Sequence, residues 1–150
     1  MNDLSIRTMR PDEILDSGEL GRSRRLESGL ADDACFAAID REGFLIGELD
    51  GALAATVSCV EYGATFAFLG FCIVREDLRG RGYGLRIWDA AIAHTGPRVI
   101  GLDGVVARQQ NYRKSGFELA YANVRCGGIV AAPDAPQAGV MALAEVHWRL

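Results

Sequence analysis

The sequence lacks the cysteine patterns that mark metal-binding and redox proteins. Its cysteines are Cys35, Cys59, Cys72 and Cys126, and their spacing matches neither a zinc site nor a redox pair. Cys59 and Cys72 lie in apolar, strand-like runs, so we predict that they are small core residues. We therefore expect no metal ion and a reducing, cytoplasmic compartment.

Export and membrane signals are also absent from the sequence. The first residues, Met1–Asp3, lack the basic and apolar regions of a signal peptide. The longest apolar run, Ala64–Val74, is too short to span a membrane. A membrane is therefore not an expected partner of this chain.

An excess of positive charge is missing as well. The 150 residues include 16 Lys and Arg against 20 Asp and Glu, which gives a net charge of −4. Nucleic-acid binders are usually basic, so nucleic acid is not an expected partner. A local positive patch, which suits a small polyanion, is formed by Arg75, Arg79, Arg81 and Arg86. The length predicts a single domain over residues 1–150.

The most informative stretch is Arg79–Gly84, in which glycine alternates with arginine and tyrosine. An apolar run, Phe66–Val74, precedes it and an amphipathic run, Leu85–His94, follows it, so the order is strand, loop, helix. Glycines let successive backbone N–H groups face a ligand, and the helix start adds its positive dipole end. A phosphate-bearing ligand is therefore predicted, the alternative being a solvated turn. The motif GxxxxGK(S/T) is absent, and the dinucleotide motif GxGxxG fails at Leu85.

Hydrophobic periodicity and turn signals predict the order β α α β β β α β α β β. The predicted strands are 4–9, 44–49, 52–62, 65–74, 99–102, 117–126 and 140–144. One predicted helix begins at Pro11, and the other three cover residues 30–39, 85–94 and 104–115. Because strands alternate with helices only in the middle, we predict an α+β fold whose mixed, mostly antiparallel sheet contains one parallel crossover.

Three local signals refine this prediction. The pair Asp50-Gly51 between two apolar runs predicts a hairpin, because both turn residues can take positive φ. Gly70, in the middle of a strand, predicts a bulge or a close backbone approach. The helix after the glycines is predicted to bury the side that carries Leu85, Trp88, Ala91 and Ile92.

Two motifs, in this order, resemble those of the GNAT superfamily of acyl-CoA-dependent N-acetyltransferases. The first is RxxGxG at Arg79–Gly84, and the second is YRKSGF at Tyr112–Phe117, at the end of the next predicted helix. The likeness covers roughly residues 4–144 and implies a GNAT-like sheet of about seven strands with a splayed parallel pair, flanked by about four helices. The stretch Gly101–Tyr112 looks like a bacterial subgroup that often carries a second C-terminal domain. Since the chain stops at Leu150, that domain is expected to be absent.

The resemblance implies that acetyl-CoA is the cofactor and that two segments bind it. The coenzyme A pyrophosphate would be held by backbone N–H groups of Arg79, Gly80, Arg81, Gly82, Tyr83 and Gly84. The pantetheine arm would pair with the strand at Cys72, Ile73 and Val74. A backbone N–H near Val74 would stabilise the oxyanion. Where many members have a cofactor-contacting asparagine this chain has Val105, and Asp103 or Asn111 is the expected substitute.

The resemblance also implies the catalytic residues. Tyr112 occupies the position of the general acid that protonates the leaving thiolate, the alternative being a helix-face aromatic in the core. The central strand lacks a carboxylate, yet an ammonium must lose a proton before it attacks. Asp103 is the first candidate base, with a helix N-cap as the alternative. Glu61 is the second, with a surface charge as the alternative, and His94 is interpreted as a favourable contact with a helix dipole.

The sequence thus favours an N-acetyltransferase in which a primary amine attacks acetyl-CoA directly. No Ser/His/Asp elbow or paired Cys/His suggests a covalent route. A non-catalytic acyl-CoA-binding sensor and a nucleotide- or phosphate-binding module of another fold are the alternatives. The acceptor is expected to be a small-molecule or peptide amine, bound by residues 20–40 and the loop after Cys126. A homodimer is expected only by analogy with other small domains.

Overall fold

A computed structural model describes residues 3–14 and 32–124 of the chain. The chain divides into two compact units, Met1–Gln110 and Asn111–Leu150. The predicted strand at 140–144 and most of the predicted acceptor side lie outside the described residues. That the whole chain forms one domain stays a prediction.

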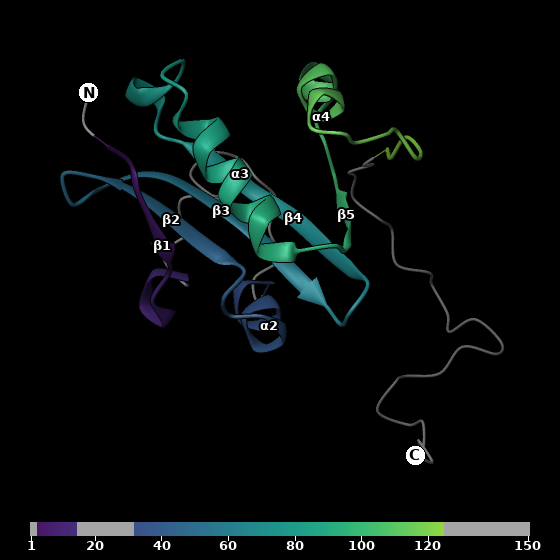
Figure 1. Cartoon of the computed structure of the whole chain (residues 1–150), viewed down its shortest axis with the longest axis horizontal. Helices are drawn as coiled ribbons and strands as arrows, with labels where there is room; N and C mark the ends of the chain where they lie inside the picture. The colour runs from purple at the N-terminus through teal and green to yellow at the C-terminus, as the bar shows by residue number, and fades with distance from the viewer. Residues whose placement is uncertain (1–2, 15–31, 125–150) are drawn as a thin grey trace, which may run out of the picture. The chain divides into compact units, whose positions relative to one another are not determined.

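A five-stranded sheet in the order β1-β2-β3-β4-β5 forms the centre of the first unit (Figure 1). Neighbouring strands are antiparallel from β1 to β4, whereas β4 and β5 are parallel. The predicted mixed sheet is therefore confirmed, and β4 lies between β3 and β5, so it is not an edge strand. The strands are β1 (Ser5–Thr8), β2 (Phe44–Leu49), β3 (Ala52–Tyr62), β4 (Phe66–Val74) and β5 (Val99–Leu102).

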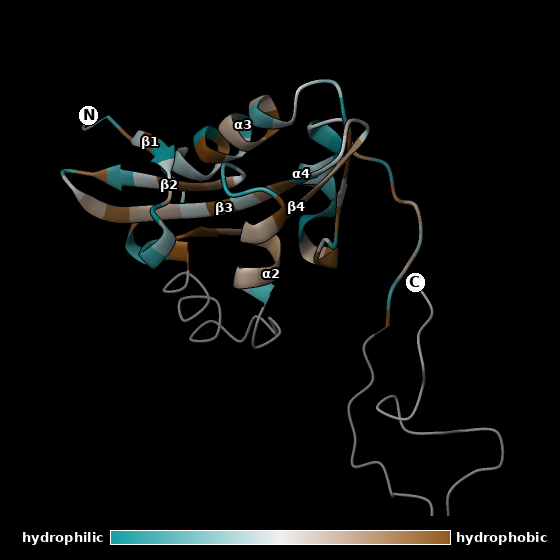
Figure 2. Ribbon diagram, turned by 90° about the horizontal axis from the view of Figure 1, so that it is seen from below, coloured by the Kyte–Doolittle hydropathy of each residue, from teal (hydrophilic) through white to brown (hydrophobic). Residues whose placement is uncertain are grey.

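Helices lie on both faces of this sheet. Figure 2 shows α3 (Tyr83–Thr95) on one face and α2 (Asp32–Ile39) on the other. Residues 11–14 are also helical. Two short 3-10 helices, η1 (Glu76–Leu78) and η2 (Val106–Arg108), come before α3 and before α4 (Gln109–Lys114).

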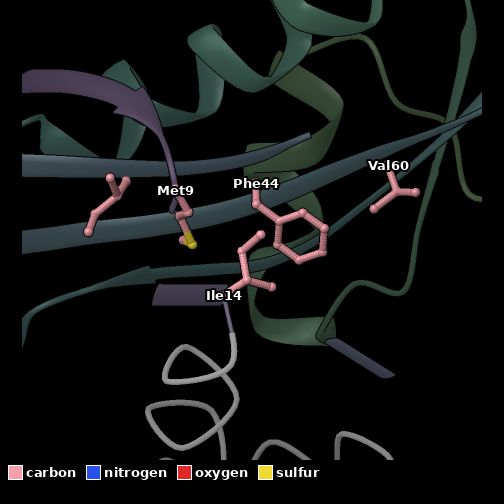
Figure 3. Packing of buried hydrophobic residues seen from close by; sticks show 5 residues of the cluster. Met9, Ile14, Phe44 and Val60 are labelled. Carbon is pink, nitrogen blue, oxygen red and sulfur yellow. The ribbon is translucent and has the colours of Figure 1, made fainter. Parts of the chain in front are cut away.

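Two apolar clusters of described residues form part of the core of the first unit, and buried residues such as Val57 and Ile87 lie outside both. On the α2 side, Phe36 and Ala37 pack against a buried group that Figure 3 shows in part, made of Met9, Ile14, Phe44, Ile46 and Val60. The second cluster joins β1, β3 and the segment before α3, and its buried members are Leu4, Ala54, Leu78 and Tyr83. Each buried large aliphatic side chain stabilises the fold by about 1.5–3 kcal/mol relative to its exposed form.

The hairpin and the strand bulge are both where the sequence predicts them. Asp50 and Gly51 join β2 to β3 with φ angles of 51° and 77°, as a type I′ turn requires. The bulge in β4 lies beside Gly70, but the residue with positive φ is Phe71, at 48°.

Three predictions about the elements were wrong. On α3, Trp88 and Ala91 are buried as predicted, but Leu85 is 62% exposed, and the buried side carries Tyr83 and Ile87 instead. The helix predicted from Gly104 begins later, with η2 and then α4. Residues 117–124 form no strand, so the described part of the chain has five strands and the predicted seven are not confirmed.

Among the described residues, no helix combines the length and the apolar character that crossing a membrane would require.

Candidate functional site

The glycine loop, Arg79–Gly82, is held at both ends by buried side chains. Leu78 before it and Tyr83 after it are 6% and 8% exposed and belong to one apolar cluster. The four residues between them are all exposed. Because the ring of Tyr83 belongs to the core, a cofactor role for this predicted residue would depend on its backbone N–H.

Backbone geometry turns this loop toward the start of α3. Gly80 and Gly82 have φ angles of 75° and 85°, a region that side-chain-bearing residues rarely adopt. Open space surrounds the position of a Cβ on either glycine, so conformation rather than crowding requires glycine there. Gly84 differs, because a Cβ there would lie 3.2 Å from Cγ2 of Val74. It lets α3 lie close to the end of β4.

The N–H groups of this segment remain available to a ligand. Leu85 and Arg86 donate to the carbonyl of Gly82 at 3.1 and 3.2 Å. Within the described ranges, the N–H groups from Gly80 to Gly84 donate no hydrogen bond to another part of the chain, and no side chain caps α3. Unpaired donors at a helix N-terminus form an anion site, because they add to the positive end of the helix dipole.

The positive patch is smaller than the sequence suggests. Arg75 forms a two-bond ion pair with Asp77 and also donates to a carbonyl of β3. Arg86 forms an ion pair with Asp3 at 2.8 Å and donates a hydrogen bond to the carbonyl of Leu4, directly before β1. Arg79 donates one bond, of 3.3 Å, to the carbonyl of Val74. In the described residues Arg81 forms no ion pair or side-chain hydrogen bond, so its guanidinium is the charge most available to a ligand.

The outer edge of β4 is only half paired. Pairing between β4 and β5 runs from Phe66–Val99 to Leu69–Leu102 and stops there within the described residues. β4 continues to Val74 and still pairs with β3 on its other side. The last residues of β4 thus have no neighbouring strand on the side of β5, although the carbonyl of Val74 accepts the bond from Arg79. A ligand that adds to a strand requires such a free edge.

The side chains at this end of β4 face different ways. Cys72 is exposed, so its prediction as a core residue was wrong, whereas Cys59 is fully buried as predicted. Ile73 is 9% exposed, and Val74 packs partly against the cluster that holds the loop. Although the residue as a whole is exposed, partial desolvation of its sulfur raises the pKa of the Cys72 thiol to about 11.

The remaining predicted residues come from other segments. Asp103 is exposed and directly follows β5 in the first unit. Asn111 and Tyr112 belong to the second unit, where Asn111 is exposed and Tyr112 is half-buried. The carbonyl of Tyr112 accepts the N–H groups of Ser115 and Phe117 and so closes α4. The roles of these three residues stay predictions.

A separate polar cluster joins three elements of the first unit. Asp40 Oδ2 lies 3.0 Å from Nε2 of His94 and accepts the N–H of Glu61 at 3.0 Å. Two ion-pair contacts of 2.8 and 2.9 Å hold Glu61 to Arg98. Burial alone would raise the pKa of Asp40. The hydrogen bonds from His94 and from backbone N–H groups together lower it by more, so the net shift of the pKa is downward.

Oxygen and nitrogen ligand atoms of Asp40, Glu61 and His94 lie within 4.8 Å of one another, a spacing that a metal ion could bridge. The guanidinium of Arg98 already forms an ion pair with the carboxylate of Glu61, and its positive charge would repel a bound cation. We therefore assign this cluster a structural role: it ties the end of α2 to β3 and α3. Glu61 is accordingly a weaker candidate base than Asp103.

Sequence reasoning missed this cluster and one further contact. Thr56 in β3 donates its hydroxyl to the carbonyl of Phe71 at the β4 bulge, at 3.4 Å. Neither arrangement follows a local pattern, because its members come from separate stretches of the chain. Only Gly70, beside the bulge, gave a sequence signal.

Comparison with known proteins identifies the family. A family model described as "Acetyltransferase (GNAT) family" matches residues 12–117. The chain is 40% identical over 119 residues to the holothin acyltransferase of Pseudoalteromonas sp. (strain SANK 73390), a match that spans 77% of this chain and 40% of that relative. The chain therefore spans less than half the length of this curated relative.

Solved structures show the same fold. Ard1 from Thermoplasma volcanium superposes with a TM-score of 0.67 at 19% identity, over 79% of this chain and 84% of that one. N-acetylglutamate synthase from Neisseria gonorrhoeae, solved in complex with coenzyme A and L-arginine, gives a TM-score of 0.61 at 17% identity, over 81% of this chain and 28% of that one. Because the family model matches residues 12–117, most of its length, the chain belongs to the GNAT family of acetyltransferases.

Proposed function

We propose that the protein transfers an acetyl group from acetyl-CoA to a primary amine. The observation that carries the proposal is the row of unpaired N–H groups from Gly80 to Gly84 at the start of α3. A pyrophosphate, with several anionic oxygens, matches such a row of donors. Arg81, whose charge is available, would add an ionic contact to the same ligand.

The pantetheine arm would lie along the outer edge of β4. Cys72, Ile73 and Val74 lie past the point where β5 stops pairing, so their backbone groups can hydrogen-bond an extended ligand. The thioester would then reach a backbone N–H near Val74. A donor placed there stabilises the negative charge that develops on the carbonyl oxygen.

In the proposed reaction the neutral amine attacks the thioester carbon directly. The C–N bond forms and the C–S bond breaks, and coenzyme A leaves as a thiolate. Tyr112 would protonate that thiolate, while Asp103, through water, would take the proton that the ammonium must lose.

The acceptor is proposed to be a small-molecule or peptide amine. The relative that is 40% identical is named a holothin acyltransferase, so holothin is the first acceptor to test. Because that name specifies acyl rather than acetyl transfer, the donor panel should include longer acyl-CoA thioesters.

The decisive experiment incubates the protein with acetyl-CoA and a panel of amines and measures the free thiol released. Thiol release that depends on an amine supports the transferase. Tight binding of acetyl-CoA without turnover of any amine favours the sensor instead, an alternative that the lack of a carboxylate in β4 supports. Thermal stabilisation by NAD or ATP, but not by acetyl-CoA, would overturn both readings.

A further inference from the structure

The bulge in β4 changes the pairing between β3 and β4. Thr56 pairs with Ile73, and Ser58 pairs with Gly70, so two residues of β4 lie opposite one residue of β3. Such a bulge bends its strand and shifts the alternation of groups that point to the two edges. The backbone of Phe71 absorbs the change with a φ of 48°, which is uncommon for an aromatic residue.

A buried hydroxyl contacts this unusual residue. Thr56 is 4% exposed, and its Oγ1 donates to the carbonyl of Phe71 at 3.4 Å. Its neighbour in β2 is Ile46, a member of the apolar cluster on the α2 side. Since water is scarce on this face, the hydroxyl and the carbonyl stabilise each other's position.

The bulge separates two functionally different parts of β4. Before it, Phe66–Leu69 pairs with β5. Cys72, in the bulge, and Ile73 and Val74 after it have no partner strand on that side within the described ranges. Because the bulge adds one residue to β4, it determines which N–H and C=O groups of Cys72–Val74 point to the outer edge of the sheet. Any change in the backbone of Phe71 therefore changes the outer edge.

We propose that Thr56 is a positioning residue for the acyl-pantetheine arm. Its hydroxyl holds the bulge at Phe71 so that the outer edge of Cys72–Val74 presents the backbone groups with which the arm pairs. This inference rests on the proposed function, because it takes acetyl-CoA as the ligand of that edge. It does not involve the glycine loop, which would bind the other end of the same molecule.

The test compares two ligands by calorimetry on the full chain. Acetyl-CoA carries the arm, whereas adenosine 3′,5′-bisphosphate has the nucleotide end without it. We expect Thr56→Val, which keeps the shape but removes the hydroxyl, to bind acetyl-CoA about fivefold more weakly and the bisphosphate unchanged. The effect is modest because the 3.4 Å contact is longer than a typical hydroxyl bond. Thr56→Ser should restore acetyl-CoA affinity.

Thr95→Val is the matched control, since Thr95 is also buried and donates its hydroxyl to the carbonyl of Ile92 in α3, at 2.8 Å. It should leave the affinities for both ligands unchanged. Equal losses for both ligands in Thr56→Val, no loss for either, or failure of Thr56→Ser to restore binding would overturn the inference. If the wild-type protein binds acetyl-CoA as expected but acetylates no amine, the transferase proposal fails while this comparison still decides the role of Thr56.

Discussion

At the scale of single residues, glycines with a similar positive φ have different consequences for ligand binding, depending on the element that follows them. Gly63 and Gly82 have φ angles of 70° and 85°, and a Cβ added to either would meet no atom within 4 Å. Gly63 lies in the turn between β3 and β4, whereas Gly82 directly precedes α3. Only at Gly82 does the turn present N–H donors together with a helix start.

Gly82→Val should abolish coenzyme A binding while the fold survives. A branched side chain at positive φ raises the free energy of that backbone conformation by about 1–2 kcal/mol. The loop should therefore leave the conformation in which its N–H groups face the ligand. Gly63→Val imposes the same strain at a site away from the loop and should reduce the melting temperature similarly without loss of binding. Calorimetry and circular dichroism measure the two effects, and equal binding by both variants would contradict the anion site.

Tyr112→Phe should lower kcat by about 100-fold with little change in acetyl-CoA affinity, because a general acid contributes at least that much to the rate. Steady-state kinetics and calorimetry separate the two quantities. A parallel loss of turnover and affinity would instead assign Tyr112, which is half-buried, a packing role.

At the scale of elements, α3 connects the proposed anion site to the core. Its N-terminus begins the site, and its buried face packs on β3 and β4 (Figure 1). Ile87 is fully buried in this face, whereas Leu85, two residues earlier, is 62% exposed.

Ile87→Ala should therefore destabilise the fold by about 2–5 kcal/mol through lost burial and the cavity left behind. Leu85→Ala should change the free energy of unfolding by less than about 0.5 kcal/mol, since exposed positions contribute little. Urea denaturation followed by circular dichroism measures both, and similar midpoints for the two variants would show that α3 packs differently.

At the scale of the whole molecule, ion clusters make the first unit sensitive to acid. Arg7 of β1 binds Glu13 at 2.8 Å and Glu48 of β2 at 2.7 Å. The hydrogen bond from Arg7 is the main reason why the pKa of Glu13 falls to about 2. The pKa of Asp40, in the other cluster, is also lowered.

A carboxyl group with a lowered pKa takes up a proton more readily in the unfolded chain than in the folded one. The stability that Glu13 contributes should thus be complete above its usual pKa, about 4.5, and be lost as the pH falls toward 2. Thermal melts between pH 7 and pH 2.5 should show this loss, and Glu13→Gln should make the decline shallower. Glu118→Gln, at an exposed position, is the control; an identical decline in all three proteins would contradict the role of the Arg7 cluster.

Short-range sequence patterns were sufficient for much of this protein. The Asp50-Gly51 turn, the bounds of β2, β3 and β5, and the loop before α3 each depend on residues within one turn or one strand. Steric limits on φ and the side-chain period act between near neighbours, so the sequence alone expresses them. The spacing of the Arg79–Gly84 and Tyr112–Phe117 motifs likewise pointed to the GNAT family before any fold was known.

Tertiary structure alone decided which groups are available for chemistry. Arg86 is occupied by Asp3, which lies far away in the sequence, whereas Arg81 forms no ion pair among the described residues. The hydroxyl of Thr56 at the β4 bulge depends on strand pairing between residues far apart in the sequence. Burial, ion pairing and strand register are set by contacts between distant segments, and these contacts exist only once the chain has folded.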